Sequence, residues 1–155
     1  MKVDLNIVMV DRVPKKRQVM GKIQIGDFEE YFDSPLDWWD IDDYERQWKN
    51  VIVRLVNYDE SCFVVAINNP QHRKFIEWWP MYKIGNKIHI QNHIIVEDIY
   101  EEMIGDKLFT LETCYDFIPK YHSHTQEGNK ISEWVIDWNE WGCNHYQQEG
   151  LDQID

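Results

Sequence analysis

The sequence is poor in positive charge. Its 155 residues contain 16 Lys and Arg against 28 Asp and Glu, which gives a formal net charge of −12. A field of this sign repels phosphate backbones and anionic lipid, so the composition argues against direct binding of nucleic acid or of a membrane surface. Such a field attracts basic proteins, or it only keeps the protein soluble, and charge alone leaves both readings open.

Long apolar runs are also missing. The opening stretch, Val3–Val10, is interrupted by Asp4 and Asn6, so it predicts a strand and neither an export signal nor a membrane-spanning helix. Cysteine is scarce, and its spacing matches no short metal-binding pattern. We therefore expect free thiols in a reducing cytoplasm. The three cysteines are Cys62, Cys114 and Cys143.

Catalytic motifs are absent as well. The sequence has no Gly-x-Ser-x-Gly, no Gly-rich phosphate loop and no His-Glu-x-x-His. His89 and His93 lie four residues apart in a strand-like segment without a third ligand, so we predict no metal site and no cofactor. We expect a protein that is not an enzyme. The alternative is a small enzyme that uses His and Cys, or two carboxylates, in an aromatic pocket.

Aromatic residues, in contrast, are abundant: eight Trp, eight Tyr and six Phe. They supply the burial that a folded core needs, and they also dominate interface anchors. No repeat or linker divides the chain, so we expect one domain over residues 1–146 and a frayed polar tail over 147–155. A second alternative is a ligand-binding module whose exposed tryptophans form a stacking platform. Its candidates are Trp38, Trp39, Trp78, Trp79, Trp138 and Trp141.

The apolar periodicity predicts an α+β fold, with a mainly antiparallel sheet and two to four helices packed on it. The clearest helix covers residues 41–56, with Asp40 or Asp42 as its cap and a solvated side that includes Gln47. Residues 62–67 predict a central buried strand, and Gly85-Asn86 predicts a hairpin turn. The remaining elements are expected as strands over 3–13, 19–25, 75–82, 87–95 and 130–138 and a helix over 108–117.

The segment 27–45 is the best candidate for function. Its nineteen positions hold nine carboxylates and no Lys or Arg, with aromatic residues between the acids. The carboxylates repel one another, and acids beside aromatics are typical of an interface core with a charged rim. The alternative is a solvated loop whose aromatics point inward. We predict as partner-binding residues the anchors Phe28, Tyr31, Phe32 and Trp39 and the rim Asp27, Glu29, Glu30, Asp33 and Asp37.

Several segments between residues 36 and 138 together resemble the immunity proteins of bacterial contact-dependent growth inhibition systems. The first is Trp38-Trp39 with Tyr44-Glu45-Arg46-Gln47-Trp48 and Arg54-Leu55. The others are Gln91-Asn92, Tyr115-Asp116-Phe117-Ile118-Pro119 and Gly128-Asn129-Lys130-Ile131-Ser132-Glu133-Trp134. The N-terminal hairpin lies outside this resemblance.

The resemblance implies a cytoplasmic protein without catalytic residues that binds and neutralises the C-terminal toxin domain of a large exoprotein. Such toxins are often nucleases, including tRNA-cleaving ones. A nuclease active site must be basic to hold phosphates, so an acidic inhibitor fits it as a substitute for nucleic acid. The resemblance carries over the binding role but no contact residue, and positions such as Trp48, Ser132 and Trp134 are expected to belong to the scaffold. It leaves the oligomeric state open.

Overall fold

The computed structural model describes residues 2–10 and 16–141 of the chain, with side chains over 18–139. Residues 11–15, Cys143 and the predicted tail over 147–155 lie outside the described residues. The strands are β1 (Lys2–Val10), β2 (Lys16–Ile25), β3 (Phe28–Pro35), β4 (Glu60–Ile67), β5 (Phe75–Ile84), β6 (Lys87–Gln91), β7 (His93–Val96) and β8 (Glu133–Asp137). The helices are α1 (Ile41–Tyr58), α2 (Glu97–Met103) and two 3₁₀ turns, η1 (Cys114–Phe117) and η2 (Trp138–Trp141).

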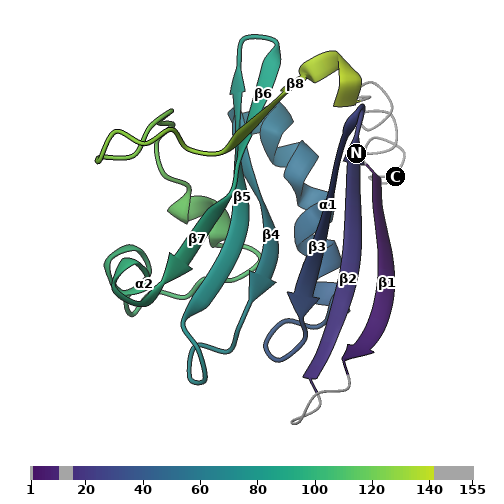
Figure 1. Cartoon of the computed structure of the whole chain (residues 1–155), viewed down its shortest axis with the longest axis vertical. Helices are drawn as coiled ribbons and strands as arrows, with labels where there is room; N and C mark the ends of the chain where they lie inside the picture. Colours follow the sequence, from purple (N-terminus) through teal and green to yellow (C-terminus); the bar gives the residue numbers. More distant parts are fainter. Residues whose placement is uncertain (1, 11–15, 142–155) are drawn as a thin grey trace.

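The strands form two antiparallel sheets that lie side by side, with α1 behind the junction between them (Figure 1). The first sheet has the order β1-β2-β3. The second has the order β4-β5-β6-β8, and β7 also pairs with β5. The predicted α+β class with a mainly antiparallel sheet is confirmed. In the described ranges, no helix combines the length and apolar character needed to cross a membrane.

Helix α1 begins where the sequence predicts. Asp40 is its N-cap and forms a capping box with Asp43, in which each carboxylate accepts a hydrogen bond from the backbone N–H of the other residue at 2.9 and 3.1 Å. The helix ends at Asp59, whose left-handed backbone (φ 60°) lets its N–H reach the carbonyl of Leu55. Its buried stripe consists of Tyr44, Gln47, Trp48, Val51, Ile52 and Leu55.

A cluster of aromatic rings joins α1 to both sheets. Trp48 stacks on Phe63 of β4 at 5.0 Å between ring centroids, and Phe63 stacks on Trp79 of β5 at 5.3 Å. Phe32 of β3 meets all three rings edge-on, at interplanar angles of 74 to 88°. Each buried ring removes a large apolar area from water and gains from this geometry, so the cluster is the centre of the core.

Side chains, rather than another strand, satisfy the outer edge of β4. Gln47 donates to the carbonyl of Cys62 at 2.8 Å and accepts the N–H of Val64 at 2.9 Å. Trp48 donates its indole N–H to the carbonyl of Val64 at 2.8 Å. Two further hydroxyls complete the edge, since Ser34 donates to Val65 and Tyr44 accepts the N–H of Ile67. Buried backbone groups require such partners, so α1 and β3 close the edge without adding a strand.

The pairing of β2 with β3 depends on one glycine. Gly21 lies opposite Phe32 in the register, and the Phe32 ring covers its Cα so closely that a Cβ would overlap the ring. Only glycine leaves room for an aromatic ring at this position. Val19, Gly21, Ile23 and Ile25 alternate along the strand and are all buried, so they form its inward face.

The helix predicted over Leu108–Phe117 is wrong, and only Cys114–Phe117 forms a 3₁₀ turn. Thr110 and Thr113 explain the difference. The Thr110 hydroxyl accepts the N–H groups of Glu112 and Thr113, while the Thr113 hydroxyl donates to the carbonyl of Leu108. These local bonds compete with helical ones, so the segment folds as turns and leaves Leu108 76% exposed.

Three smaller expectations also need correction. Gln47 is buried rather than solvated, since it serves the β4 edge. The strand at residues 62–67 is buried as predicted, yet it is the first strand in its sheet rather than a central one. The hairpin turn at Gly85-Asn86 is confirmed, but the returning strand breaks at Asn92 into β6 and β7, which pair with different halves of β5.

Replacement of Gln47 by Leu tests the closure of the β4 edge. The side chain of Gln47 is fully buried, so Q47L strands the carbonyl of Cys62 and the N–H of Val64 without partners. Each unsatisfied buried group costs about 1–3 kcal/mol, so we expect the free energy of unfolding to fall by roughly 2–5 kcal/mol. Urea denaturation measures this loss. The exposed N50L on the same helix is the control, and equal stability of the two variants would contradict the role of Gln47.

Candidate partner-binding surface

The acidic segment singled out in the sequence forms strand β3 and the turn that leads to α1. A turn at Gly26-Asp27, in which Gly26 has a φ of 57°, joins β3 to β2. Side chains then alternate along β3, since Phe28, Glu30, Phe32 and Ser34 face the protein while Glu29, Tyr31 and Asp33 face outward. The strand therefore presents its acids on both sides and its exposed aromatic ring on one.

The outward residues of β3 contact those of β2 across the pair. Lys22 lies opposite Tyr31 in the register, and its Nζ is 5.7 Å from the centre of the Tyr31 ring. The same Nζ is 3.2 Å from Oε1 of Glu29, while Gln24 donates to Oε2 of Glu29 at 3.3 Å. Both oxygens of Glu29 thus have partners. Tyr31 is 65% exposed and is the centre of this face.

Carboxylates of β3 also act on a carboxylate of the second sheet. Glu77 of β5 is half-buried, and its pKa is raised, first by burial and then by the negative charges of Asp33 and Glu30. Among the described residues, none of these three carboxylates has an ion-pair partner. Within the residues whose side chains are described, this side of the molecule consequently has negative charge without an ion-pair partner.

The turn between β3 and α1 continues the acidic surface. Asn68 donates to both oxygens of Asp37, at 3.1 and 3.2 Å, which fixes the turn against the end of β4. Trp38 is 48% exposed, whereas the next residue, Trp39, is buried. Asp40 caps the helix, so its carboxylate already has a structural role.

The structure thus divides the predicted anchors. Tyr31 is exposed and Phe28 is half-buried against Trp134, with 5.3 Å between the ring centroids. Phe32 and Trp39 are only 6% exposed, so their assignment as surface anchors is corrected. Phe32 closes the central aromatic cluster, and Trp39 packs against Tyr44 at 5.3 Å and near Phe109 at 6.5 Å. The predicted rim residues Asp27, Glu29, Asp33 and Asp37 are exposed, and Glu30 is half-exposed on the inner side.

Two residues that belong to this surface were missed by sequence reasoning. Met20 is 44% exposed and lies opposite Asp33, and Trp38 extends the face at the turn. The alternation of β2 carried a signal for Met20, because the residue falls between the inward Val19 and Gly21. No comparable signal separates Trp38 from Trp39, since a turn follows Pro35 and breaks the period of the strand.

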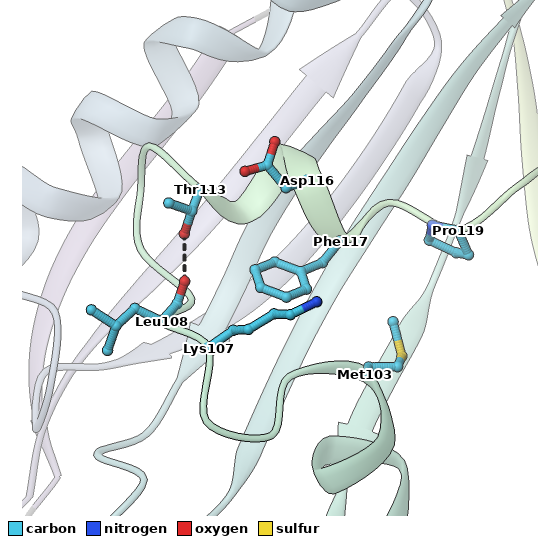
Figure 2. A pocket seen from close by; sticks show the side chains of 7 residues that line it. All are labelled: Met103, Lys107, Leu108, Thr113, Asp116, Phe117 and Pro119. Atoms are coloured by element: carbon cyan, nitrogen blue, oxygen red, sulfur yellow. Dashed lines mark hydrogen bonds between the residues drawn. The ribbon is translucent and has the colours of Figure 1, made fainter.

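A cavity of about 460 Å³ lies between α2 and η1 (Figure 2). Its lining is Met103, Lys107, Leu108, Thr113, Asp116, Phe117 and Pro119. Figure 2 shows one hydrogen bond among these residues, from the Thr113 hydroxyl to the backbone carbonyl of Leu108. A single ammonium and a single carboxylate without a mutual hydrogen bond do not form an acid–base or nucleophilic pair, so the cavity offers no catalytic constellation.

His89 and His93 take part in structural contacts. His89 lies 3.1 Å from Glu133 and 3.4 Å from the Tyr121 hydroxyl, and His93 bonds to the buried Gln91 at 2.8 Å. Burial lowers the pKa of His93 and raises that of the Cys62 thiol. Over the described ranges, no three His, Cys, Asp or Glu side chains are placed to hold a metal ion.

The tryptophans whose side chains are described do not form a stacking platform. Trp39, Trp78 and Trp79 are buried in the core, and their rings are inaccessible to a ligand. Trp138 is half-buried, and Lys83 lies over its ring at 4.9 Å. Trp38 alone among these side chains is largely exposed, so the geometry does not favour this alternative.

The charge of Glu77 makes a pH-dependent prediction. The folded-state pKa of Glu77 is raised above its ordinary value of 4.5, so the ionised carboxylate disfavours folding. The free energy of unfolding therefore decreases as pH rises through the folded-state pKa. We expect E77Q to raise the melting temperature at pH 7 by about 2 °C. The gain should vanish below about pH 4, where Glu77 is protonated in both states. The exposed E127Q is the control, and a gain that persists in acid would contradict this origin.

Comparisons with known proteins agree on one family. The family model described as the CdiI N-terminal domain matches residues 34–142. The immunity protein CdiI of Enterobacter cloacae subsp. cloacae is 36% identical over 120 residues, which cover 77% of this chain and 79% of that protein.

A solved structure adds the N-terminal strands to the match. The CdiA-CT/CdiI toxin and immunity complex from Enterobacter cloacae contains a chain with a TM-score of 0.72 and 27% identity to this one. The match covers 96% of this chain and 97% of that chain, so it extends beyond the family model to the β1–β2 hairpin. The protein therefore belongs to the CdiI family of immunity proteins.

Proposed function

We propose that this protein binds and neutralises the toxin domain of a contact-dependent growth inhibition system. Membership of the CdiI family supports this role, and so does the similarity to a chain from a CdiA-CT/CdiI toxin and immunity complex. The single observation that carries the proposal from the structure is the acidic face of β3 and the following turn. There Asp27, Glu29, Asp33 and Asp37 are exposed within one short segment.

The proposed partner surface is basic. The proposed toxin is a nuclease, and tRNA is a candidate substrate for it. A nuclease must bind phosphates with Lys and Arg, so its active site attracts a surface that carries carboxylates in their place. The uncompensated charge around Asp33, Glu30 and Glu77 supports this, because positive side chains of a partner would relieve the repulsion among them. The inhibitor then acts by covering the basic site.

The energetics of such a complex are reasonable for one face of a protein of this size. Effective immunity needs a Kd of about 1 nM or lower, which corresponds to roughly −12 kcal/mol of binding free energy. A standard interface of about 1,600 Å² with a few aromatic anchors supplies this. Complementary charge also raises the association rate toward about 10⁸ M⁻¹s⁻¹ at low salt, which matters for an inhibitor that must act as soon as the toxin arrives.

The proposal places the protein in the cytoplasm and gives it no reaction of its own. Two free buried thiols, Cys62 and Cys114, fit a reducing compartment. The open cavity between α2 and η1 and the structural histidines supply no arrangement for catalysis in the described part of the chain. Binding through a broad acidic surface is the activity that the geometry supports best.

Calorimetry with the cognate CdiA C-terminal toxin domain tests the proposal. We expect a stoichiometric complex whose affinity falls when salt rises from about 50 to about 200 mM, because the attraction is partly electrostatic. Replacement of Asp27, Glu29, Glu30, Asp33 and Asp37 by their amides should lower the affinity at least about tenfold and flatten the salt dependence. Inhibition of RNA or DNA cleavage by the toxin is measured in parallel.

The matched control is the second acidic cluster, which is exposed on α2. Amides at Glu97, Asp98, Glu101 and Glu102 remove a similar charge from a different surface. A loss confined to the β3 variant identifies the local surface, whereas equal losses in both variants would assign the effect to the overall field. Absence of any complex with wild-type protein would contradict the immunity function itself.

A further inference from the structure

The outward side chains of β2 and β3 share one face of the first sheet, and α1 lies on the other side of the sheets (Figure 1). This outward face is built by three cross-strand pairs: Met20 with Asp33, Lys22 with Tyr31, and Gln24 with Glu29. Side chains that are directly opposite on one face of a sheet contact one another, so these six residues form one patch. We call this patch the hairpin face.

The positively charged side chain of Lys22 lies at the centre of the hairpin face. The ammonium of Lys22 lies 3.2 Å from Glu29 and 5.7 Å from the centre of the Tyr31 ring. A carboxylate beside an exposed aromatic ring is a favourable place for a positive side chain, since the ion pair and the cation–π attraction act together. The side chains of Lys22 and Glu29 are 31% and 38% exposed, so this pair is accessible from solvent.

We propose that the hairpin face docks the toxin domain and that an arginine of the toxin replaces Lys22 against Glu29 and Tyr31. This inference rests on the proposed immunity function and specifies its surface. A guanidinium is the better occupant, because it bonds a carboxylate through two N–H groups and stacks flat on an aromatic ring, whereas an ammonium is a strongly hydrated point charge. Lys22 then acts as an internal competitor that the toxin displaces.

Charge complementarity supports this choice of occupant. Asp33 lies on the same face, and in the described structure it has no hydrogen bond or ion pair, so it remains available to a second basic side chain. The exposed Tyr31 and Met20 supply apolar area between the charges, as in an interface whose centre is aromatic and whose rim is charged. Phe28 and Glu30 point to the other side of β3 and therefore lie outside the hairpin face.

Three variants test the inference by calorimetry with the same toxin domain. K22M keeps the apolar stem but removes the competing charge, so we expect about two- to fivefold tighter binding. K22R holds Glu29 and Tyr31 more firmly and should weaken binding by a similar factor, although the net charge is unchanged. Y31A removes the aromatic centre and should weaken binding by about tenfold or more.

Two matched controls separate this site from general effects. K49M removes one positive charge from the exposed side of α1. It should change the affinity less than about twofold, because an exposed charge far from the interface contributes little. Tyr58 is 62% exposed and lies under Arg54 at 4.1 Å, so Y58A truncates an equivalent tyrosine on another surface without loss of affinity.

The outcomes are distinguishable from those of the proposed function. If wild-type protein binds the toxin but K22M binds no tighter than K49M, the displacement of Lys22 is overturned while the immunity function stands. If Y31A binds as well as Y58A, the hairpin face is overturned as the docking surface. If wild-type protein does not bind at all, the proposed function fails before the surface is in question.

Discussion

The structure depends on the way in which α1 closes the outer edge of β4. A buried strand edge presents N–H and carbonyl groups that must be bonded, and here three helical side chains, Tyr44, Gln47 and Trp48, provide most of the partners. Because these side chains also pack into the aromatic cluster, hydrogen bonding and burial fix the helix in the same position. The two sheets can then meet along β3 and β4 without forming a continuous ladder.

This arrangement explains the motif on which the family resemblance rests. Tyr44, Gln47 and Trp48 all belong to one short run of that motif, and each one bonds the edge of β4 or its neighbour. Gln91 has a comparable role elsewhere, because it is buried and donates to the carbonyl of His122, which holds the segment after η1 against the second sheet. These motif residues therefore stabilise the scaffold, and the proposed docking residues on β2 and β3 lie before them, outside the residues 34–142 that the family model matches.

Much of the fold was predictable from local patterns. The capped helix and the Gly85-Asn86 turn follow from short-range rules and are confirmed. Predictions failed where long-range packing or local hydroxyl bonds decided the outcome. The helix expected over 108–117 gave way to bonds made by Thr110 and Thr113, and Gln47 was assigned to solvent because polarity hid its place between Tyr44 and Val51 on the buried stripe.

The candidate surface was likewise predictable in its composition but not in the orientation of its side chains. Composition located the acidic segment, because charge and aromatic content are visible without any contact information. Which side of β3 each residue occupies depended on the sheet, and the alternation placed Tyr31 outside while Phe32 became the ring that joins three others. No strand was predicted from the sequence for this segment. The sequence therefore could not tell that the adjacent Tyr31 and Phe32 point to opposite sides.

The contact between Gly21 and Phe32 has a consequence for how new binding specificities arise. A one-residue slip of β3 along β2 would set Phe32 against a residue with a side chain, so the ring over Gly21 acts as a register lock. The outward-facing residues of β3 can therefore be substituted at little cost in stability, about 0.5 kcal/mol or less for an exposed site. The backbone register of the hairpin consequently stays fixed while single substitutions at positions 29, 31 and 33, in evolution or in a designed library, change the side chains of the proposed docking surface.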